Sequence, residues 1–137
     1  MTVQPGPEKV NEIATRYGLK LLIYFGSYQT EYYSAKSDID IAYLAKRPLS
    51  TQARIGLLND LILAHRKSEI DLVDLQTAEP ILRYEVARNG RVLFEEEEGM
   101  FSRYSLYYIK RMYELQPVIK ERMRMLMQEI KELNIDE

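Results

Sequence analysis

The chain has 137 residues, 46% of them hydrophobic, and its 19 basic and 21 acidic residues give a net charge of −2. That length fits one domain, and the hydrophobic fraction suffices for a buried core, so wholesale disorder is excluded. The absence of cysteine excludes a disulfide framework, a thiolate metal site and thiol catalysis. Because basic residues are not in excess, we expect no direct binding of duplex nucleic acid.

The N-terminal residues and the hydropathy pattern predict no contact with a membrane. The first residues of the chain lack the basic and apolar regions of a signal peptide. No apolar run approaches the roughly 18 residues that a helix needs to span a bilayer. We therefore expect a cytoplasmic protein.

The N-terminal part of the chain alternates between helical and strand-like segments. A helix is predicted over 8–17, and the apolar run over 19–25, which stops at Gly26, predicts a buried strand. Ser50 is the expected N-cap of a second helix that runs to about 66. Its apolar residues recur at helical spacing, at Ile55, Leu58, Ile62 and Leu63. Further strands are predicted over 38–44, 69–75 and 91–94, and a short helix over 80–88.

The C-terminal segment is helical in character after four consecutive glutamates at 95–98, which we expect to form a solvated connector. Apolar residues recur every three or four positions, at Phe101, Tyr104, Tyr108, Met112, Leu115, Ile119, Met123, Leu126, Ile130 and Leu133. Pro117 interrupts this stripe, so we expect a kink or two helices. The stripe can pack back on the domain, but its length and its tyrosine and methionine content favour a partner-binding surface over Phe101–Leu133. We divide the chain into a domain over 1–95 and a helical extension over 96–137.

Two short motifs on neighbouring predicted strands indicate phosphate and metal chemistry. Gly26-Ser27 follows the first strand, where glycine allows phosphate to approach closely and amide and hydroxyl groups can bind its oxygens. Asp38 and Asp40 lie two positions apart on the second strand, so their carboxylates share one face, roughly 6.5–7 Å apart. Two such carboxylates repel each other without a cation, and Mg²⁺ prefers carboxylate and phosphate oxygens. The combination predicts metal-dependent nucleotidyl transfer.

A third carboxylate is normally required to hold the metal near the nucleophile. The strand predicted over 69–75 contains Asp71 and Asp74, whose odd separation places them on opposite faces, so only one can join the site. The alternative interpretation of Asp38 and Asp40 is a pair of ordinary, solvated acids at the end of a strand.

Gly26-Ser27, ten intervening residues and then Asp38-Ile39-Asp40 resemble the Gly-Ser-x10-Asp-x-Asp signature of the DNA polymerase β-like nucleotidyltransferases. The chain length and the later segment Ile-Asp-Leu-Val-Asp-Leu at 70–75 make it similar to the minimal nucleotidyltransferases, the MNT antitoxins of HEPN/MNT toxin–antitoxin pairs. The likeness covers residues 8–95, approximately. In that family a third acid follows an apolar residue on a later strand, which favours Asp71 over Asp74.

The resemblance implies an α/β (α+β) fold, with a small mixed β-sheet backed by helices and a C-terminal helical extension. It implies ATP as co-substrate, two Mg²⁺ ions, and transfer of AMP to a tyrosine of a cognate HEPN ribonuclease toxin, which silences the toxin. The catalytic and metal-binding residues would be Asp38, Asp40 and Asp71. Many relatives have arginines after Gly-Ser, whereas Tyr-Gln-Thr stands at 28–30 here. Nucleotide binding would then depend on Gly26, Ser27, Lys36 and Ser37.

Two other functions stay open. Transfer of AMP to a small molecule such as an aminoglycoside uses the same motif, although such enzymes usually have an additional substrate-binding domain. A non-catalytic antitoxin that neutralises its toxin by occlusion is the second alternative, because the loop lacks arginines.

The candidates outside these motifs favour structural roles. His65 is the only histidine and lies next to Arg66 and Lys67 at the end of the second predicted helix, so we expect it at a solvated helix terminus. Tyr32 and Tyr33 lie in the loop of the motif, where packing is the simpler interpretation and stacking on adenine the alternative.

Overall fold

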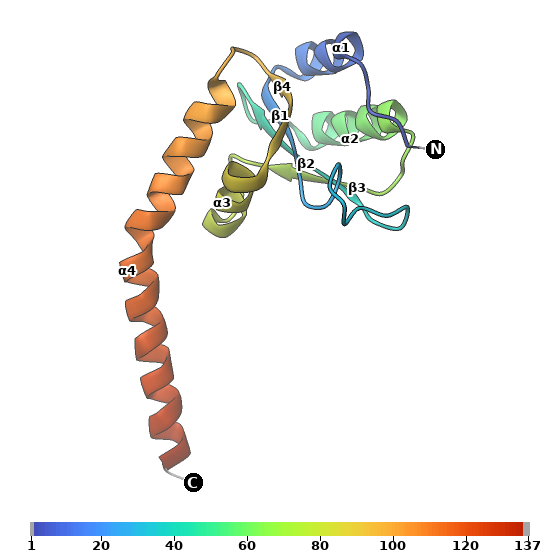
Figure 1. Cartoon of the computed structure of the whole chain (residues 1–137). Coiled ribbons are helices and arrows are strands. Elements are labelled where there is room, and N and C mark those ends of the chain that lie inside the picture. Colours follow the sequence, from blue (N-terminus) through green and yellow to red (C-terminus); the bar gives the residue numbers. More distant parts are fainter. Residues whose placement is uncertain (1, 136–137) are drawn as a thin grey trace.

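The computed structural model describes residues 2–135 and contains one four-stranded sheet with helices on both faces (Figure 1). The elements in chain order are α1 (Pro7–Tyr17), β1 (Leu19–Phe25), β2 (Ile39–Ala45), α2 (Thr51–His65), β3 (Ile70–Asp74), α3 (Pro80–Asn89), β4 (Arg91–Glu95) and α4 (Met100–Ile135). The expected fold, a small mixed sheet with helices and a C-terminal helix, is confirmed. Among the described residues, no helix is both long and apolar enough to cross a membrane.

The sheet has the strand order β3-β2-β1-β4, and β2 and β3 form its parallel pair. β1 pairs antiparallel with β2 across the loop of residues 26–38, and β4 pairs antiparallel with the other edge of β1. Because β3 returns parallel to β2 through α2, the N-terminal ends of β2 and β3 lie side by side. The C-terminal end of β1 reaches the same end of the sheet, so the loop begins next to the start of β2.

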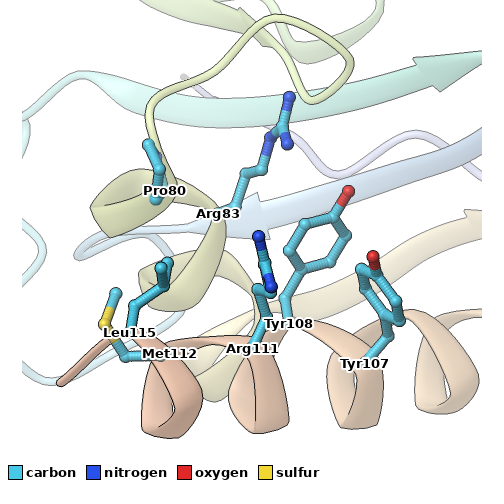
Figure 2. A pocket seen from close by; sticks show the side chains of 7 residues that line it. All are labelled: Pro80, Arg83, Tyr107, Tyr108, Arg111, Met112 and Leu115. Atoms are coloured by element: carbon cyan, nitrogen blue, oxygen red, sulfur yellow. The ribbon is translucent and has the colours of Figure 1, made fainter. Parts of the chain in front are cut away.

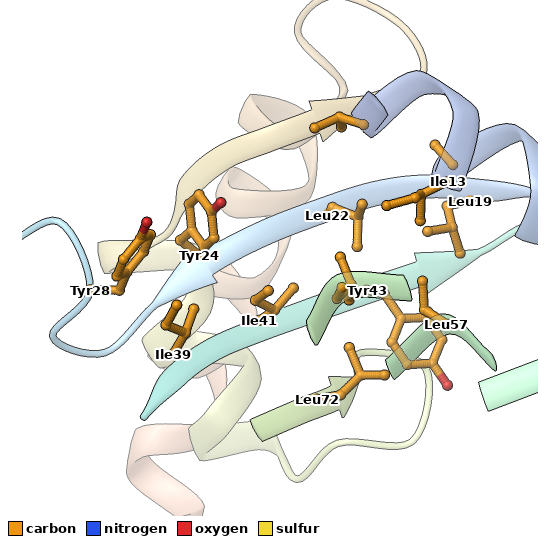
Figure 3. Packing of buried hydrophobic residues seen from close by; sticks show 13 residues of the cluster. Ile13, Leu19, Leu22, Tyr24, Tyr28, Ile39, Ile41, Tyr43, Leu57 and Leu72 are labelled. Carbon is orange, nitrogen blue, oxygen red and sulfur yellow. The ribbon is translucent and has the colours of Figure 1, made fainter. Parts of the chain in front are cut away.

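Side chains alternate between the two faces of the sheet and form two cores. The α1/α2 face is covered by α1 and α2, and its core (Figure 3) includes Ile13, Leu22, Tyr24, Ile41 and Leu57. The α3/α4 face is covered by α3 and the start of α4, and its core consists of Leu21, Ile23, Phe25, Ala42, Leu75, Val86 and Phe101. Asp40 alternates with Ile39 and Ile41, so it projects from the α3/α4 face.

α2 begins as predicted at Ser50, whose hydroxyl accepts a hydrogen bond from the backbone N–H of Ala53 (3.0 Å). The apolar spacing that predicted this helix is not its buried stripe, since Ile55 and Leu63 are 54% and 75% exposed. The helix instead buries one residue in every four, at Leu57, Leu61 and His65. Apolar residues surround much of α2, so periodicity alone did not identify the face that packs on the sheet.

His65 lies in the core of the α1/α2 face, so the expectation of a solvated helix terminus is wrong. Its side chain is 0% exposed, its Nδ1 donates to the carbonyl oxygen of Leu61 (2.7 Å), and the Tyr24 hydroxyl bonds to its Nε2 (2.6 Å). Because a carbonyl only accepts, Nδ1 carries the proton and Nε2 accepts from Tyr24. Burial lowers the pKa of His65, so the imidazole is neutral at neutral pH.

The buried neutral His65 should make the stability of the fold depend on pH. Its pKa is lower in the folded than in the unfolded chain, so below about pH 6.5 the unfolded chain binds more protons and the free energy of unfolding falls. One such group contributes a slope of at most about 1.4 kcal/mol per pH unit. Urea unfolding between about pH 7.5 and about pH 5.5 should show this slope in the wild type and a shallower one in His65→Leu. Equal slopes in the two proteins would contradict the prediction.

α4 begins against Glu95 and continues far beyond the sheet (Figure 1). The Glu95 carboxylate accepts the backbone N–H groups of Gly99 (3.0 Å) and Phe101 (3.1 Å), so this member of the acidic run caps the helix and is not simply solvated. α4 passes through Pro117 as one helix, and the alternative of two helices is wrong. The first part of α4 packs beside α3, whereas from Gln116 to Asn134 nearly every residue is exposed.

Candidate active site

The turn after β1 brings Gly26 directly against Asp40 of β2. Gly26 has a left-handed backbone (φ +68°), and a Cβ at this position would overlap Oδ2 of Asp40. The antiparallel register pairs Phe25 with Asp40, which explains the contact. Glycine is required here for both its backbone conformation and its lack of a side chain.

Asp40 and Asp71 are direct neighbours in the parallel register of β2 and β3, and Asp38 immediately precedes β2. Burial, followed by the charges of Asp71 and Asp38, raises the pKa of Asp40. Asp74 faces the opposite side of the sheet. There, burial of the Tyr43 ring and, less strongly, the charge of Asp74 raise the pKa of Tyr43. The structure thus brings Asp71, and not Asp74, next to Asp40.

The three carboxylates offer only oxygen donors, which suits Mg²⁺. Within residues 2–135, no three His, Cys, Asp or Glu side chains lie close enough to hold a metal ion on their own. Asp38 and Asp71 are exposed and Asp40 is half-buried, so the site opens to solvent. That arrangement fits an ion that takes part of its coordination from water and from substrate phosphates.

The other candidate residues lie in two turns of the loop over residues 26–38. The first turn is closed by Thr30, whose N–H and hydroxyl both donate to the carbonyl oxygen of Ser27 (2.9 and 2.5 Å). The second turn immediately precedes Asp38; in it the Ser37 hydroxyl accepts the N–H of Ser34 (3.2 Å) and the side chain of Lys36 is exposed. Ser27 therefore follows the glycine that contacts Asp40, and the turn with Lys36 and Ser37 leads directly into Asp38.

The two loop tyrosines have different environments. The Tyr33 ring packs on Tyr28 (5.0 Å between ring centroids), which itself packs on Tyr24 in the core. Tyr32 is 80% exposed. Tyr33 therefore packs within the loop, whereas the ring of Tyr32 is open to a ligand.

Residues 8–99 match the family described as Polymerase beta, Nucleotidyltransferase, and this segment holds α1 to β4 with all three carboxylates. The chain belongs to the polymerase beta nucleotidyltransferase family. The family that the Gly-Ser-x10-Asp-x-Asp spacing predicted is therefore confirmed.

Two curated relatives of this nucleotidyltransferase are both named protein adenylyltransferase MntA. The protein from Aphanizomenon flos-aquae is 31% identical over 96 residues, which cover 63% of each chain. The protein from Shewanella oneidensis is 37% identical over 86 residues, which cover 61% of each chain. The chain thus matches somewhat less than two thirds of the length of these relatives.

Two solved structures similar to this nucleotidyltransferase contain toxin–antitoxin proteins. A crystal structure of a toxin–antitoxin with AMP-PNP is 30% identical, covers 85% of this chain and 97% of the compared chain, and has a TM-score of 0.67. A structure of tri-AMPylated Shewanella oneidensis HEPN toxin in complex with MNT antitoxin is also 30% identical, covers 85% and 94%, and has a TM-score of 0.61. The predicted similarity to MNT antitoxins is confirmed.

Two basic residues beside the loop were not identified as site residues from the sequence. The guanidinium of Arg91, at the start of β4, donates to the carbonyl oxygens of Gly26 (3.1 Å) and Tyr28. The ammonium of Lys67, between α2 and β3, donates to the carbonyl oxygen of Ala35 (3.1 Å). Arg91 is 65 positions from Gly26 and Lys67 is 32 positions from Ala35, so no local motif connects them.

A cavity of about 440 Å³ lies between α3 and α4 (Figure 2). These helices cover the face of the sheet from which Asp40 projects. It is lined by Pro80, Arg83, Tyr107, Tyr108, Arg111, Met112 and Leu115. Arg83 lies over the ring of Tyr108 (5.4 Å), and the polar ends of Tyr108 and Arg111 point away from α4 on the side of Arg83. Two guanidinium groups with phenolic hydroxyls suit an anionic group.

The contact between Gly26 and Asp40 predicts a specific loss on mutation of the nucleotidyltransferase. Gly26→Ala should cost about 1–2 kcal/mol of folding free energy from its left-handed backbone, and the new Cβ should displace Asp40 and reduce nucleotidyl transfer at least tenfold. Gly18→Ala is the matched control, because Gly18 has the same backbone conformation (φ +62°) and no atom within 4 Å of its Cβ position. Thermal unfolding and initial transfer rates should show similar destabilisation of both variants but lost transfer only in Gly26→Ala.

Proposed function

We propose that this nucleotidyltransferase transfers AMP from ATP to a tyrosine hydroxyl of a cognate HEPN toxin and thereby neutralises the toxin. The observation that carries the proposal is the contact of the Gly26 turn with Asp40, which pairs with Asp71 at the same end of the sheet. Relatives named protein adenylyltransferase and a similar structure with tri-AMPylated HEPN toxin support it. Residues 1–95 form the catalytic domain and 96–137 the partner-binding extension.

The loop over 26–38 binds the triphosphate. The backbone amides of the Gly26-Ser27 turn and the Ser27 hydroxyl bind phosphate oxygens. The glycine allows the phosphate to approach closely because it has no side chain. The second turn adds the Lys36 ammonium and the Ser37 hydroxyl. Because residues 28–30 include no arginine, backbone amides carry more of this binding than charged side chains do.

The carboxylates perform the transfer. Asp38, Asp40 and Asp71 would hold Mg²⁺, two ions together with ATP, and the bound metal would neutralise phosphate charge. Asp71 orients the acceptor hydroxyl and accepts its proton. The acceptor oxygen bonds to the α-phosphorus in line as the bond from that phosphorus to the bridging oxygen breaks, and pyrophosphate leaves.

α4 presents the acceptor to this site. Its apolar stripe packs near α3 as far as Leu115 and then continues with Ile119, Met123 and Ile130, which are 44–55% exposed. An apolar surface that continues beyond the domain without covering atoms suits a helical partner. The cavity with Arg83 and Arg111 at the base of this surface suits an acidic side chain of the same partner.

Transfer from α-labelled ATP tests the proposal. The purified chain is incubated with Mg²⁺ and labelled ATP alone, with aminoglycosides, and with the HEPN protein from the neighbouring reading frame. The proposal expects label on a tyrosine of the HEPN protein together with loss of its ribonuclease activity. Label on a small molecule alone would instead support the small-molecule alternative.

A further inference from the structure

The loop over 26–38 is long, mostly exposed and without arginine at 28–30, yet it must present its amides to a triphosphate. A loop that became ordered only when ATP bound would lose much of the binding energy to conformational entropy. Two residues of the loop, Gly26 and Gln29, have left-handed backbones (φ +68° each), which fixes the first turn in one specific path. Some interaction outside the loop must therefore stabilise this path.

Arg91 contacts the first turn from the α1/α2 face. It lies opposite Tyr24 in the β1–β4 register, so both side chains project from that face, away from Asp40. Its guanidinium donates to the carbonyl oxygens of Gly26 (3.1 Å), Tyr28 and Asn89 (2.9 Å). A planar guanidinium with five donors can hold several carbonyls in one fixed arrangement, which a flexible ammonium cannot do.

Lys67 contacts the second turn from the same side. It is only 8% exposed, and its ammonium donates to the carbonyl oxygen of Ala35 (3.1 Å) and lies near the Glu69 carboxylate (3.7 Å) and the Tyr33 ring (5.8 Å). A buried ammonium is costly unless it is paired, so these partners confine it to one position. Tyr28 and Tyr33 pack against each other below the loop.

The direction of these hydrogen bonds determines where the loop amides point. In a trans peptide the C=O and the following N–H point in opposite directions. The chain has no cis peptide bond among its described residues, so holding the carbonyls of Gly26 and Tyr28 toward Arg91 turns the N–H groups of Ser27 and Gln29 away from it. Asp40 projects from the opposite face of the sheet to Arg91, so it lies on the side to which these N–H groups point.

We propose that Arg91 and Lys67 are positioning residues. They bind loop carbonyls on the side opposite Asp40, so that the loop amides face the triphosphate. The two cations order the loop without touching the nucleotide, and this order replaces the arginines missing after Gly-Ser. The inference rests on the proposed function, since it assumes that the loop binds ATP.

Hydrogen exchange and ATP binding in Arg91→Gln and Lys67→Met test this role. Without nucleotide, both variants should exchange the amides of the loop turns, such as Thr30 and Ser37, at least tenfold faster, while β1 and β2 exchange as in the wild type. The KM for ATP should rise about tenfold, with a smaller change in kcat, and saturating ATP·Mg²⁺ should restore loop protection. Arg88→Gln is the matched control, because Arg88 is exposed on α3, and it should change neither quantity.

The loop exchange rates and the KM for ATP together decide whether the inference holds. A raised KM with unchanged loop exchange would mean that Arg91 contacts the nucleotide directly, and faster exchange with unchanged KM would mean that loop order does not matter; either overturns it. Faster exchange in β1 and β2 as well would show a general loss of structure and also overturn it. If the wild type binds no ATP, the proposed function fails and the inference with it, whereas normal transfer by both variants removes only the inference.

Discussion

Replacing Asp38 and Asp40 together with Asn is expected to reduce AMP transfer at least about 1,000-fold, which corresponds to roughly 4 kcal/mol of transition-state stabilisation. Asp38 immediately precedes β2 and Asp40 lies near its start, where it contacts the Gly26 turn and neighbours Asp71. Asn keeps the size of each side chain but removes the charge that a divalent cation requires. The measurement is the initial rate of label transfer from α-labelled ATP to the HEPN protein.

Asp74→Asn is the matched control, because Asp74 lies on the next strand but faces the other side of the sheet, and this variant should keep wild-type transfer. The double variant should also stay folded. Burial and the charges of two other acids raise the pKa of Asp40, so its charge destabilises the metal-free fold. Removing that charge should therefore maintain or raise the melting temperature of the metal-free protein. Full neutralisation of the toxin by the double variant would contradict the catalytic function and favour occlusion.

Replacing Ile119 and Met123 with Gln should weaken binding of the HEPN protein at least about 100-fold, since exposed apolar anchors at the centre of an interface each contribute on the order of 2 kcal/mol. The two residues are 44% and 55% exposed on the part of α4 that extends beyond the sheet (Figure 1). Gln preserves helix propensity, so α4 itself should persist. Titration calorimetry with the HEPN protein measures the loss.

Leu63→Gln controls for the removal of an exposed apolar side chain, because Leu63 is 75% exposed on α2 and belongs to the other face of the sheet. It should bind the partner like the wild type, and all three proteins should melt within a few degrees of one another. Equal partner affinity of the α4 variant and the wild type would show that the partner docks elsewhere. Transfer to the partner should fall with affinity, while ATP binding stays unchanged.

The local chemistry of the site was readable from sequence because it depends on short spacings. A glycine after an apolar run and two aspartates two positions apart have the same geometric meaning in any strand–turn–strand unit. The alternation of Asp40 with Ile39 and Ile41 assigned the acid to one face of β2, and the odd separation of Asp71 and Asp74 showed that only one could join it. Whether each residue acts as predicted is for the variants to decide.

Interactions between distant segments were not readable in this way. His65 was expected in solvent, yet it is buried because the last turn of α2 points it at Tyr24, and α2 shows no clear apolar stripe that would reveal its packed face. Arg91 and Lys67 resemble any surface cation in sequence, and only the pairing of β4 with β1 and of β3 with β2 brings them to the loop.

The spacing of Gly26, Asp38 and Asp40 was therefore enough to predict the family and the kind of chemistry, since a strand and a tight turn convert such spacing directly into geometry. The hydrogen bonds that other elements make to the loop over 26–38 were visible only in the tertiary structure. These hydrogen bonds join groups far apart in the chain, and their donors, unlike a glycine in a turn, have no local constraint that marks them.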